Sequence, residues 1–251
     1  MINRSRGLDG CQSPSPDSMT ICSQVIAARY WQSKMSISNY NLGLEIFDFF
    51  MAGTELPANA ISFGVFHVAR NPPIIERLRK ELYDAEFIVD NRFQSLATLE
   101  KLPFLNAVVK ETLRLGNLVP GRLPRVTPPE GMSVADLHIP GGTVISASAH
   151  LVHMNPSKFP EPEKFIPERW LARRPGGFKL ENYLFAFSTG SRDCIGRELA
   201  FAEIRAVIAC LVSFFEVELA DPQDYFLDLG WKDNIVSSYE RDVLVAVRER
   251  R

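Results

Sequence analysis

The residues in this sequence that are best suited to chemistry surround Cys194, in the decapeptide from Phe187 to Gly196. A cysteine thiolate binds iron strongly, and Gly190 and Gly196 allow the backbone to turn sharply and approach a flat cofactor closely. Arg192 is a permanent cation that can pair with a carboxylate. This combination favours a thiolate metal site over the alternative of an inert, buried cysteine at a helix start.

A helix is expected to begin directly after Cys194, because apolar residues follow it at the three- and four-residue spacing of one buried helix face. These residues are Ile195, Leu199, Ala200, Ile204, Val207, Ile208, Leu211 and Phe215. The positive N-terminal end of such a helix would point at the sulfur and favour its anionic form. The helix therefore adds to the prediction that Cys194 is a metal ligand.

A charged pair lies on the helix expected between Pro103 and Gly116, since proline suits a first helical turn and glycine a helix end. Glu111 and Arg114 are three residues apart, so they share one face of that helix. Its apolar side is formed by Leu105, Val108, Thr112 and Leu115. Alone, the pair would be a surface ion pair contributing roughly 0–1 kcal/mol. Beside the cysteine loop, we expect it to belong to a buried charge network.

The other elements that position these residues are helices followed by short strands. Helices are expected at 41–70, ending at Asn71-Pro72-Pro73, and at 73–83. A β-hairpin is expected over 133–147, with its turn at Pro140-Gly141-Gly142. Residues 155–180 are rich in proline and charge and are expected to be irregular, and a small sheet is expected over 217–249, with a strand at 243–247.

The composition excludes several classes of protein. The chain has 251 residues, of which 46% are hydrophobic and 23% charged, values typical of a globular domain with a real core. A formal net charge of −2 gives no reason to expect nucleic acid as a partner. The sequence contains no run of about 18 apolar residues, which is the length that a membrane-spanning helix needs. The four cysteines form no CxxC pair, so neither a zinc site nor a disulfide framework is indicated.

Three motifs together resemble the cytochrome P450 family. They are the decapeptide Phe-x-x-Gly-x-Arg-x-Cys-x-Gly at 187–196, the Glu-x-x-Arg motif at 111–114, and Phe-Ile-Pro-Glu-Arg-Trp at 165–170. The resemblance covers 41–251 and implies the C-terminal half of this fold, which is mainly α with small β sheets (α+β). Residues 119–125 resemble fungal secondary-metabolism members. Residues 1–40 do not match the family and are expected to form a partly disordered N-terminal extension that contains a short helix from Met19 to Tyr30.

The resemblance implies a role for each matching residue. Cys194 would be the axial thiolate ligand of the iron of haem b, and Phe187 would shield its sulfur. Arg192 and Arg125 would pair with the haem propionates. The two glycines of the loop, Gly190 and Gly196, would allow close approach of the macrocycle.

The resemblance also implies residues outside the cysteine loop. A buried structural network would be formed by Glu111, Arg114 and Arg169. Leu118 and Val119 would line the substrate pocket. The oxygen side of the haem would be formed by Ala52, Gly53 and Glu55.

The chain departs from the family at Leu56, which stands where a threonine hydroxyl would orient a water chain that delivers protons. Thr54 lies about 200° away around an ideal helix and cannot simply replace it. One hypothesis is that Pro57 compensates, because a proline frees the carbonyl of Gly53 to hold a water; Pro57→Ala should then alter the coupling of oxygen consumption to product. Altered or decayed activity, or an isomerase-like use of haem, are the alternatives.

The function implied by the resemblance is that of a haem-thiolate monooxygenase. Such an enzyme hydroxylates or epoxidises an apolar small molecule with dioxygen, taking electrons from NADPH–cytochrome P450 reductase. The alternative is a truncated, non-catalytic fragment that binds haem weakly or not at all. Eukaryotic members are usually held at the endoplasmic reticulum membrane by an N-terminal anchor that this sequence does not show, so localisation stays open.

Overall fold

The computed structural model of the chain describes residues 39–89, 92–93, 95–172, 179–226, 229–234, 236–242 and 244–250. It divides into two compact units, 1–54 and 55–251. The short helix expected at Met19–Tyr30, and the disorder expected near the N-terminus, lie outside the described residues. Among the described helices, none has the length and hydrophobicity needed to cross a membrane.

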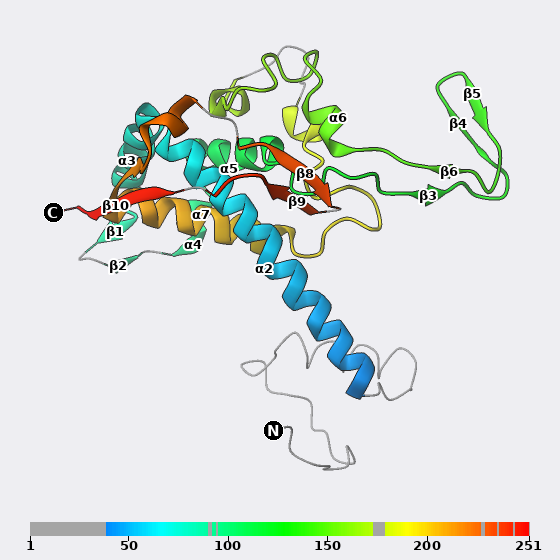
Figure 1. Cartoon of the computed structure of the whole chain (residues 1–251), viewed down its shortest axis with the longest axis horizontal. Helices are drawn as coiled ribbons and strands as arrows, with labels where there is room; N and C mark the ends of the chain where they lie inside the picture. Colours follow the sequence, from blue (N-terminus) through cyan, green and yellow to red (C-terminus); the bar gives the residue numbers. More distant parts are fainter. Residues whose placement is uncertain are drawn as a thin grey trace. The chain divides into compact units, whose positions relative to one another are not determined.

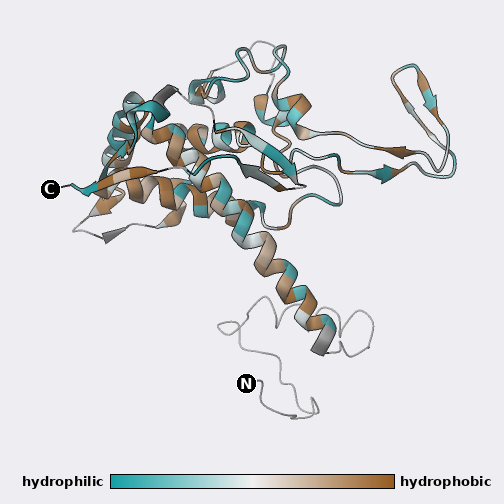
Figure 2. Cartoon of the chain, viewed as in Figure 1, coloured by the Kyte–Doolittle hydropathy of each residue, from teal (hydrophilic) through white to brown (hydrophobic). Residues whose placement is uncertain are grey.

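Helix α2 runs from Asn39 to Ala69, as predicted, and continues through Pro57. In the first unit, the predicted apolar stripe is largely uncovered, because the side chains of Ile46, Phe49 and Phe50 are exposed. Figure 2 shows hydrophobic and hydrophilic residues alternating along this helix. In the second unit, the buried residues of α2 belong to two hydrophobic clusters. These buried residues are Ala60, Phe63, Phe66, Val68 and Ala69.

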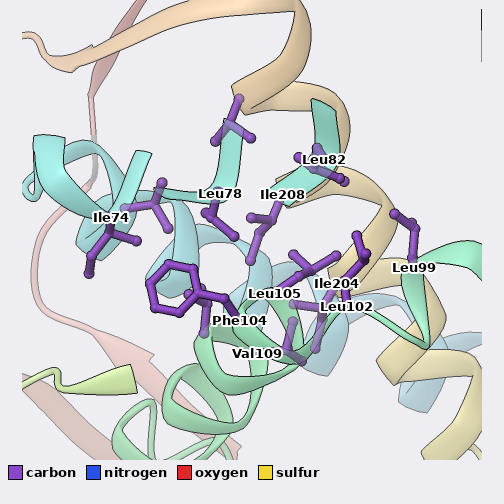
Figure 3. Close-up of a cluster of buried hydrophobic side chains, with 14 of the residues drawn as sticks. Ile74, Leu78, Leu82, Leu99, Leu102, Phe104, Leu105, Val109, Ile204 and Ile208 are labelled. Carbon is purple, nitrogen blue, oxygen red and sulfur yellow. The ribbon is translucent and has the colours of Figure 1, made fainter. Parts of the chain in front are cut away.

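The core of the second unit lies where α3 (Pro72–Asp84), α4 (Leu96–Leu99), α5 (Pro103–Leu115) and α7 (Arg197–Phe214) pack together (Figure 1). Figure 3 shows aliphatic side chains from all four helices meeting in this cluster. Helix α5 begins at Pro103, as predicted, and ends at Leu115, with Gly116 as its C-cap. The carboxylate of Glu81 on α3 accepts the backbone N–H groups of Phe104 and Leu105 at 2.7 and 2.8 Å, which satisfies the first turn of α5.

The buried face of α7 differs from the predicted stripe. Ile204 and Ile208 are buried, but Leu199 and Val207 are 57% and 39% exposed, and the buried face continues instead through Val212. The helix also starts at Arg197, which leaves the segment after Cys194 outside it. The sequence held two overlapping sets of residues at helical spacing, and packing against α3 and α5 selected the set that includes positions 204, 208 and 212.

The hairpin predicted over 133–147 is wrong in its pairing. Strand β4 (Met132–Val134) pairs antiparallel with β5 (Leu137–Ile139), so the turn falls at residues 135–136. Strand β6 (Val144–Ile145) pairs instead with β3 (Arg125–Val126). Ala135 accepts a left-handed φ of 49° at the tighter turn, and the Pro-Gly-Gly segment connects two different two-stranded sheets.

The segment after α6 is irregular as expected, but the small sheet expected over 217–249 is two separate two-stranded sheets, and the strand expected at 243–247 lies at 245–249. Residues 155–172 contain a single 3-10 turn, η2 (Pro167–Trp170), and η4 (Leu180–Tyr183) follows after the undescribed residues 173–178. Other elements are β1 (Ile88–Val89), β2 (Arg92–Phe93), α6 (Ala149–His153), β7 (Phe215–Leu219), η5 (Pro222–Phe226), β8 (Trp231–Asn234), β9 (Val236–Tyr239) and β10 (Val245–Glu249). In the C-terminal segment, β7 pairs with β10 and β8 with β9. The predicted α+β class is confirmed.

Candidate functional site

The carboxylate of Glu111 is the centre of a buried charge network. It is fully buried on α5 and accepts five hydrogen bonds. Two come from the guanidinium of Arg114 at 2.9 and 2.8 Å, and one from Arg169 Nε at 2.9 Å. The Trp170 indole N–H and the Ile166 backbone N–H complete the set at 2.9 and 3.0 Å. The three residues predicted to form a network therefore do lie in contact.

The two guanidinium groups of this network also hold the irregular segment that follows α6. Arg114 uses all five of its N–H groups, because its remaining donors bond the carbonyls of His153, Pro162 and Lys164 at 3.0, 2.7 and 3.2 Å. Arg169 donates to the carbonyl of Pro160 at 2.8 Å. Buried charges are tolerated only when they are paired and fully hydrogen-bonded. The network thus fixes the backbone of 153–170 against α5.

The loop that carries Cys194 is closed by its own backbone. The N–H of Cys194 donates to the carbonyl of Phe187 at 3.0 Å, and the N–H of Asp193 to that of Gly190 at 3.2 Å. Ser188 and Gly190 have φ of 61° and 86°, in the left-handed region that a glycine adopts freely and a serine does not. The loop is therefore a tight, specified turn, which ends three residues before α7 begins.

The surroundings of Cys194 fit a flat, apolar group that carries carboxylates. The cysteine is free and exposed, and its neighbour Ile195 is 89% exposed. A Cβ added at Gly190 would meet no atom within 4 Å, so the space beside the loop is open. Arg192 is exposed and has no ion-pair partner in the described ranges. A single thiolate suffices as protein ligand for haem, and the described residues contain no cluster of His, Cys, Asp or Glu that would suggest another metal site.

The ring of Phe187 anchors the loop on α7. Its centroid lies 5.2 Å from that of Phe201, and the guanidinium of Arg197 lies 5.9 Å from it. Arg197 in turn pairs with Asp193 at 2.8 Å. The contact between Phe187 and Cys194 that the structure shows is the backbone hydrogen bond, and the predicted shielding of the sulfur by the ring stays a prediction.

The structure places the residues expected to line the substrate pocket and to bind the second propionate in different environments. Leu118 is 8% exposed and belongs to the hydrophobic core, and together with Val119 it lines a cavity of only about 10 Å³. A space of that size holds about one water, and the predicted role of these two side chains in lining a substrate pocket stays a prediction. Arg125 is exposed on β3, and its guanidinium donates to the neighbouring carbonyl of Pro124 at 2.8 Å.

The residues expected on the oxygen side lie on α2 at the boundary between the two units. Ala52 and Gly53 belong to the first unit and Glu55 to the second, and all three are exposed. The hydroxyl of Thr54 donates to the carbonyl of Phe50 at 2.6 Å, so it is engaged within the helix. Leu56 is half-buried against the core of the second unit.

Sequence reasoning missed two participants. Trp170 belongs to the motif at 165–170, but the motif does not predict its hydrogen bond to Glu111; its position directly after Arg169 is the signal that the sequence offers. His153 and the other three histidines lack the spacing of metal ligands, so the sequence predicts only structural or surface positions for them. In the structure His153 is buried, and its Nε2 accepts the backbone N–H of Phe185 at 3.0 Å. No local sequence pattern predicts that hydrogen bond.

Comparison with known proteins defines the class. The chain belongs to the cytochrome P450 family, whose family model matches residues 12–236. That match begins within 1–40, the segment expected to lie outside the resemblance, and therefore includes part of it.

Among similar proteins, cytochrome P450 monooxygenase aneF of Aspergillus aculeatus is 37% identical over 203 residues, which is 81% of this chain and 40% of the relative. Cytochrome P450 monooxygenase hkm5 of Aspergillus hancockii is 37% identical over 211 residues, 84% of this chain and 40% of the relative. Cytochrome P450 monooxygenase ankB of Aspergillus thermomutatus is 42% identical over 175 residues, which is 70% of this chain and 33% of the relative. The predicted resemblance to fungal members is confirmed, and the chain spans about 40% of the length of the first two relatives.

Proposed function

We propose that this chain supplies the thiolate-bearing part of a haem-dependent monooxygenase. The observation that carries the proposal is that two features occur together. One is an exposed cysteine in a tight loop closed by its own backbone. The other is the buried Glu111 network, in which every N–H group of Arg114 is hydrogen-bonded and which fixes the nearby backbone. Similarity to proteins named cytochrome P450 monooxygenase supports it. When bound, haem b would supply the chemistry of dioxygen activation.

The roles of the chain's own residues follow from their placement. Cys194 would donate its thiolate to the iron, and Arg192, which is exposed and has no ion-pair partner in the described part of the chain, would pair with a propionate. Arg125 would turn from its local carbonyl to the second propionate. Gly190 and Gly196 would let the macrocycle lie close to the loop. The Glu111 network would keep the loop in place and take no part in the reaction.

The reaction we propose inserts one atom of dioxygen into an apolar small molecule of fungal secondary metabolism. The second oxygen atom leaves as water, which requires two electrons and two protons, and NADPH–cytochrome P450 reductase is the proposed electron source. Ala52, Gly53 and Glu55 would lie on the oxygen side of the haem. Leu56 cannot hold a proton-delivering water there, because it has no donor or acceptor.

Leu56 is also the observation that favours a second candidate. A leucine packed against the core in place of a hydroxyl is what a protein that retains the scaffold without the oxygen chemistry would show. Leu56→Thr separates the two. If proton delivery is the missing step, this variant should raise the fraction of consumed dioxygen that appears in product. A protein without oxygen chemistry would form no product with either residue.

The proposal is tested by haem uptake and ligation. The purified chain is titrated with haem, reduced with dithionite and exposed to carbon monoxide, and a thiolate-type Soret band is the expected result. The Cys210→Ala variant is the matched control, because Cys210 lies on α7 and is only half-exposed, and it should keep the band. Cys194→Ala should lose it. Failure of the chain to take up haem, or a thiolate band that survives in Cys194→Ala, would refute the proposal.

A further inference from the structure

His153 is a buried imidazole that the proposed chemistry does not use. It is the last residue of α6 and is 2% exposed, with its ring edge-on to Phe159 at a centroid distance of 6.2 Å. Burial and the nearby guanidinium of Arg114 lower the pKa of His153 to about 4. The ring is therefore neutral at neutral pH, and a neutral imidazole has one nitrogen that can accept a hydrogen bond.

Two hydrogen bonds place His153 between the ion network and the cysteine loop. Its backbone carbonyl accepts Arg114 Nη1 at 3.0 Å. Its Nε2 accepts the backbone N–H of Phe185 at 3.0 Å, which puts the ring proton on Nδ1. One residue thus joins a side chain of the saturated network to the backbone two residues before Phe187.

The bonds continue from Phe185 into the loop. The carbonyl of Phe185 accepts the N–H of Ser188 at 2.9 Å, and the carbonyl of Phe187 accepts the N–H of Cys194 at 3.0 Å. Ser188, between these two bonds, has a left-handed φ of 61°. A strained backbone of this kind persists only where its surroundings over-determine it. The hydrogen bond that the Phe185 N–H donates to His153 Nε2 holds the residue from which the strained turn starts.

We propose that His153 is a positioning residue for the Cys194 thiolate, which acts by tying the start of the cysteine loop to the Glu111–Arg114 network. The importance of the thiolate's position rests on the proposed function. The connection itself is a property of the protein without haem and is tested in that state.

The test compares two polar variants that differ by one methylene. In His153→Gln, the side-chain oxygen can occupy the place of Nε2 and accept the Phe185 N–H, whereas the side chain of His153→Asn is too short to reach it. Amide hydrogen exchange is measured on the full haem-free chain, with the amides of α5 as internal reference. We expect the amides of Phe185, Ser188 and Cys194 to exchange about five- to tenfold faster in His153→Asn. In His153→Gln they should stay within about twofold of wild type.

Alkylation of Cys194, followed by peptide mass spectrometry, supplies the second readout. The rate should rise in His153→Asn and recover in His153→Gln, while that of Cys210 stays unchanged in both. The proposal is overturned if only the Phe185 amide responds, or if the α5 amides accelerate by the same factor, because His153 would then act on its own contact or on the whole fold. If the variants show these loop effects but the wild-type chain takes up no haem, the proposed function fails and the positioning role stands.

Discussion

Removal of the charge at Glu111 should destabilise this chain more than any change at a surface ion pair. In Glu111→Gln the amide nitrogen replaces one carboxylate oxygen. If it replaces Oε2, the hydrogen bonds from Arg114 Nε and Trp170 Nε1 are lost. Hydrogen bonds to a charged group contribute about 1.5–3 kcal/mol each, so the loss is about 3–6 kcal/mol. Breaking a buried ion pair independently predicts about 3–5 kcal/mol.

The assay is urea unfolding of the haem-free chain, followed by circular dichroism. The midpoint should fall while the denaturant slope stays the same, because the surface exposed on unfolding does not change. The melting temperature should drop by roughly 6–20 °C. Glu181→Gln is the matched control, since Glu181 pairs at 2.7 Å with Lys110 on the same helix but at the surface. The control should cost at most about 1 kcal/mol.

An equal, small effect of both variants would refute this reasoning. It would mean that the network relaxes to admit water around Arg114 and that its saturation does not govern stability. An effect on Glu111→Gln accompanied by a lower denaturant slope would also count against it, because the native state would then have loosened and the free energies could not be compared.

Three further predictions follow from single residues. Burial lowers the pKa of His67 to about 3. The unfolded chain therefore binds a proton near pH 6.5 at this residue, whereas the folded chain does not. The free energy of unfolding should fall from pH 7 to pH 5, and it should fall less steeply in His67→Phe. Gly190→Ala should cost about 1–2 kcal/mol through its φ of 86° alone, whereas Gly196→Ala, with φ of −85°, should be nearly neutral in the same unfolding assay. Gly64→Ala places a Cβ 3.1 Å from Thr112 on α5 and should lower the free energy of unfolding by about 1–3 kcal/mol despite the better helix propensity of alanine.

The parts of the fold that could be predicted from the sequence are those that local spacing determines. Helix α5 was placed from Pro103 to Gly116 because proline and glycine restrict the backbone at their own positions. The strand pairs were not predicted correctly, since the Pro-Gly-Gly segment is a strong turn signal but says nothing of which strand pairs with 144–145. That partner, 125–126, lies nearly 20 residues away and was selected by the register of the folded chain.

The same limit applies to the site. The contact of Glu111 with Arg114 follows from helical geometry, and the contact with Arg169 came from the family motif. The hydrogen bonds that Trp170 donates to Glu111 and that the Phe185 N–H donates to His153 join partners 59 and 32 residues apart. One of those partners is a backbone N–H, which every residue except proline possesses. A sequence pattern cannot select among so many equivalent donors, and only the packed structure does.

Hydrogen-bond saturation separates two kinds of arginine in this chain. Arg114 is fully buried and uses every N–H group on acceptors of the chain itself, so no donor is left for a ligand. Arg192 is exposed, and within the described ranges its guanidinium has no partner, next to an exposed cysteine and an exposed Ile195. Residues whose hydrogen bonds are all made within the chain, such as Arg114, contribute to its stability. The exposed charged and apolar side chains beside the Cys194 thiol are the ones that a bound cofactor would contact.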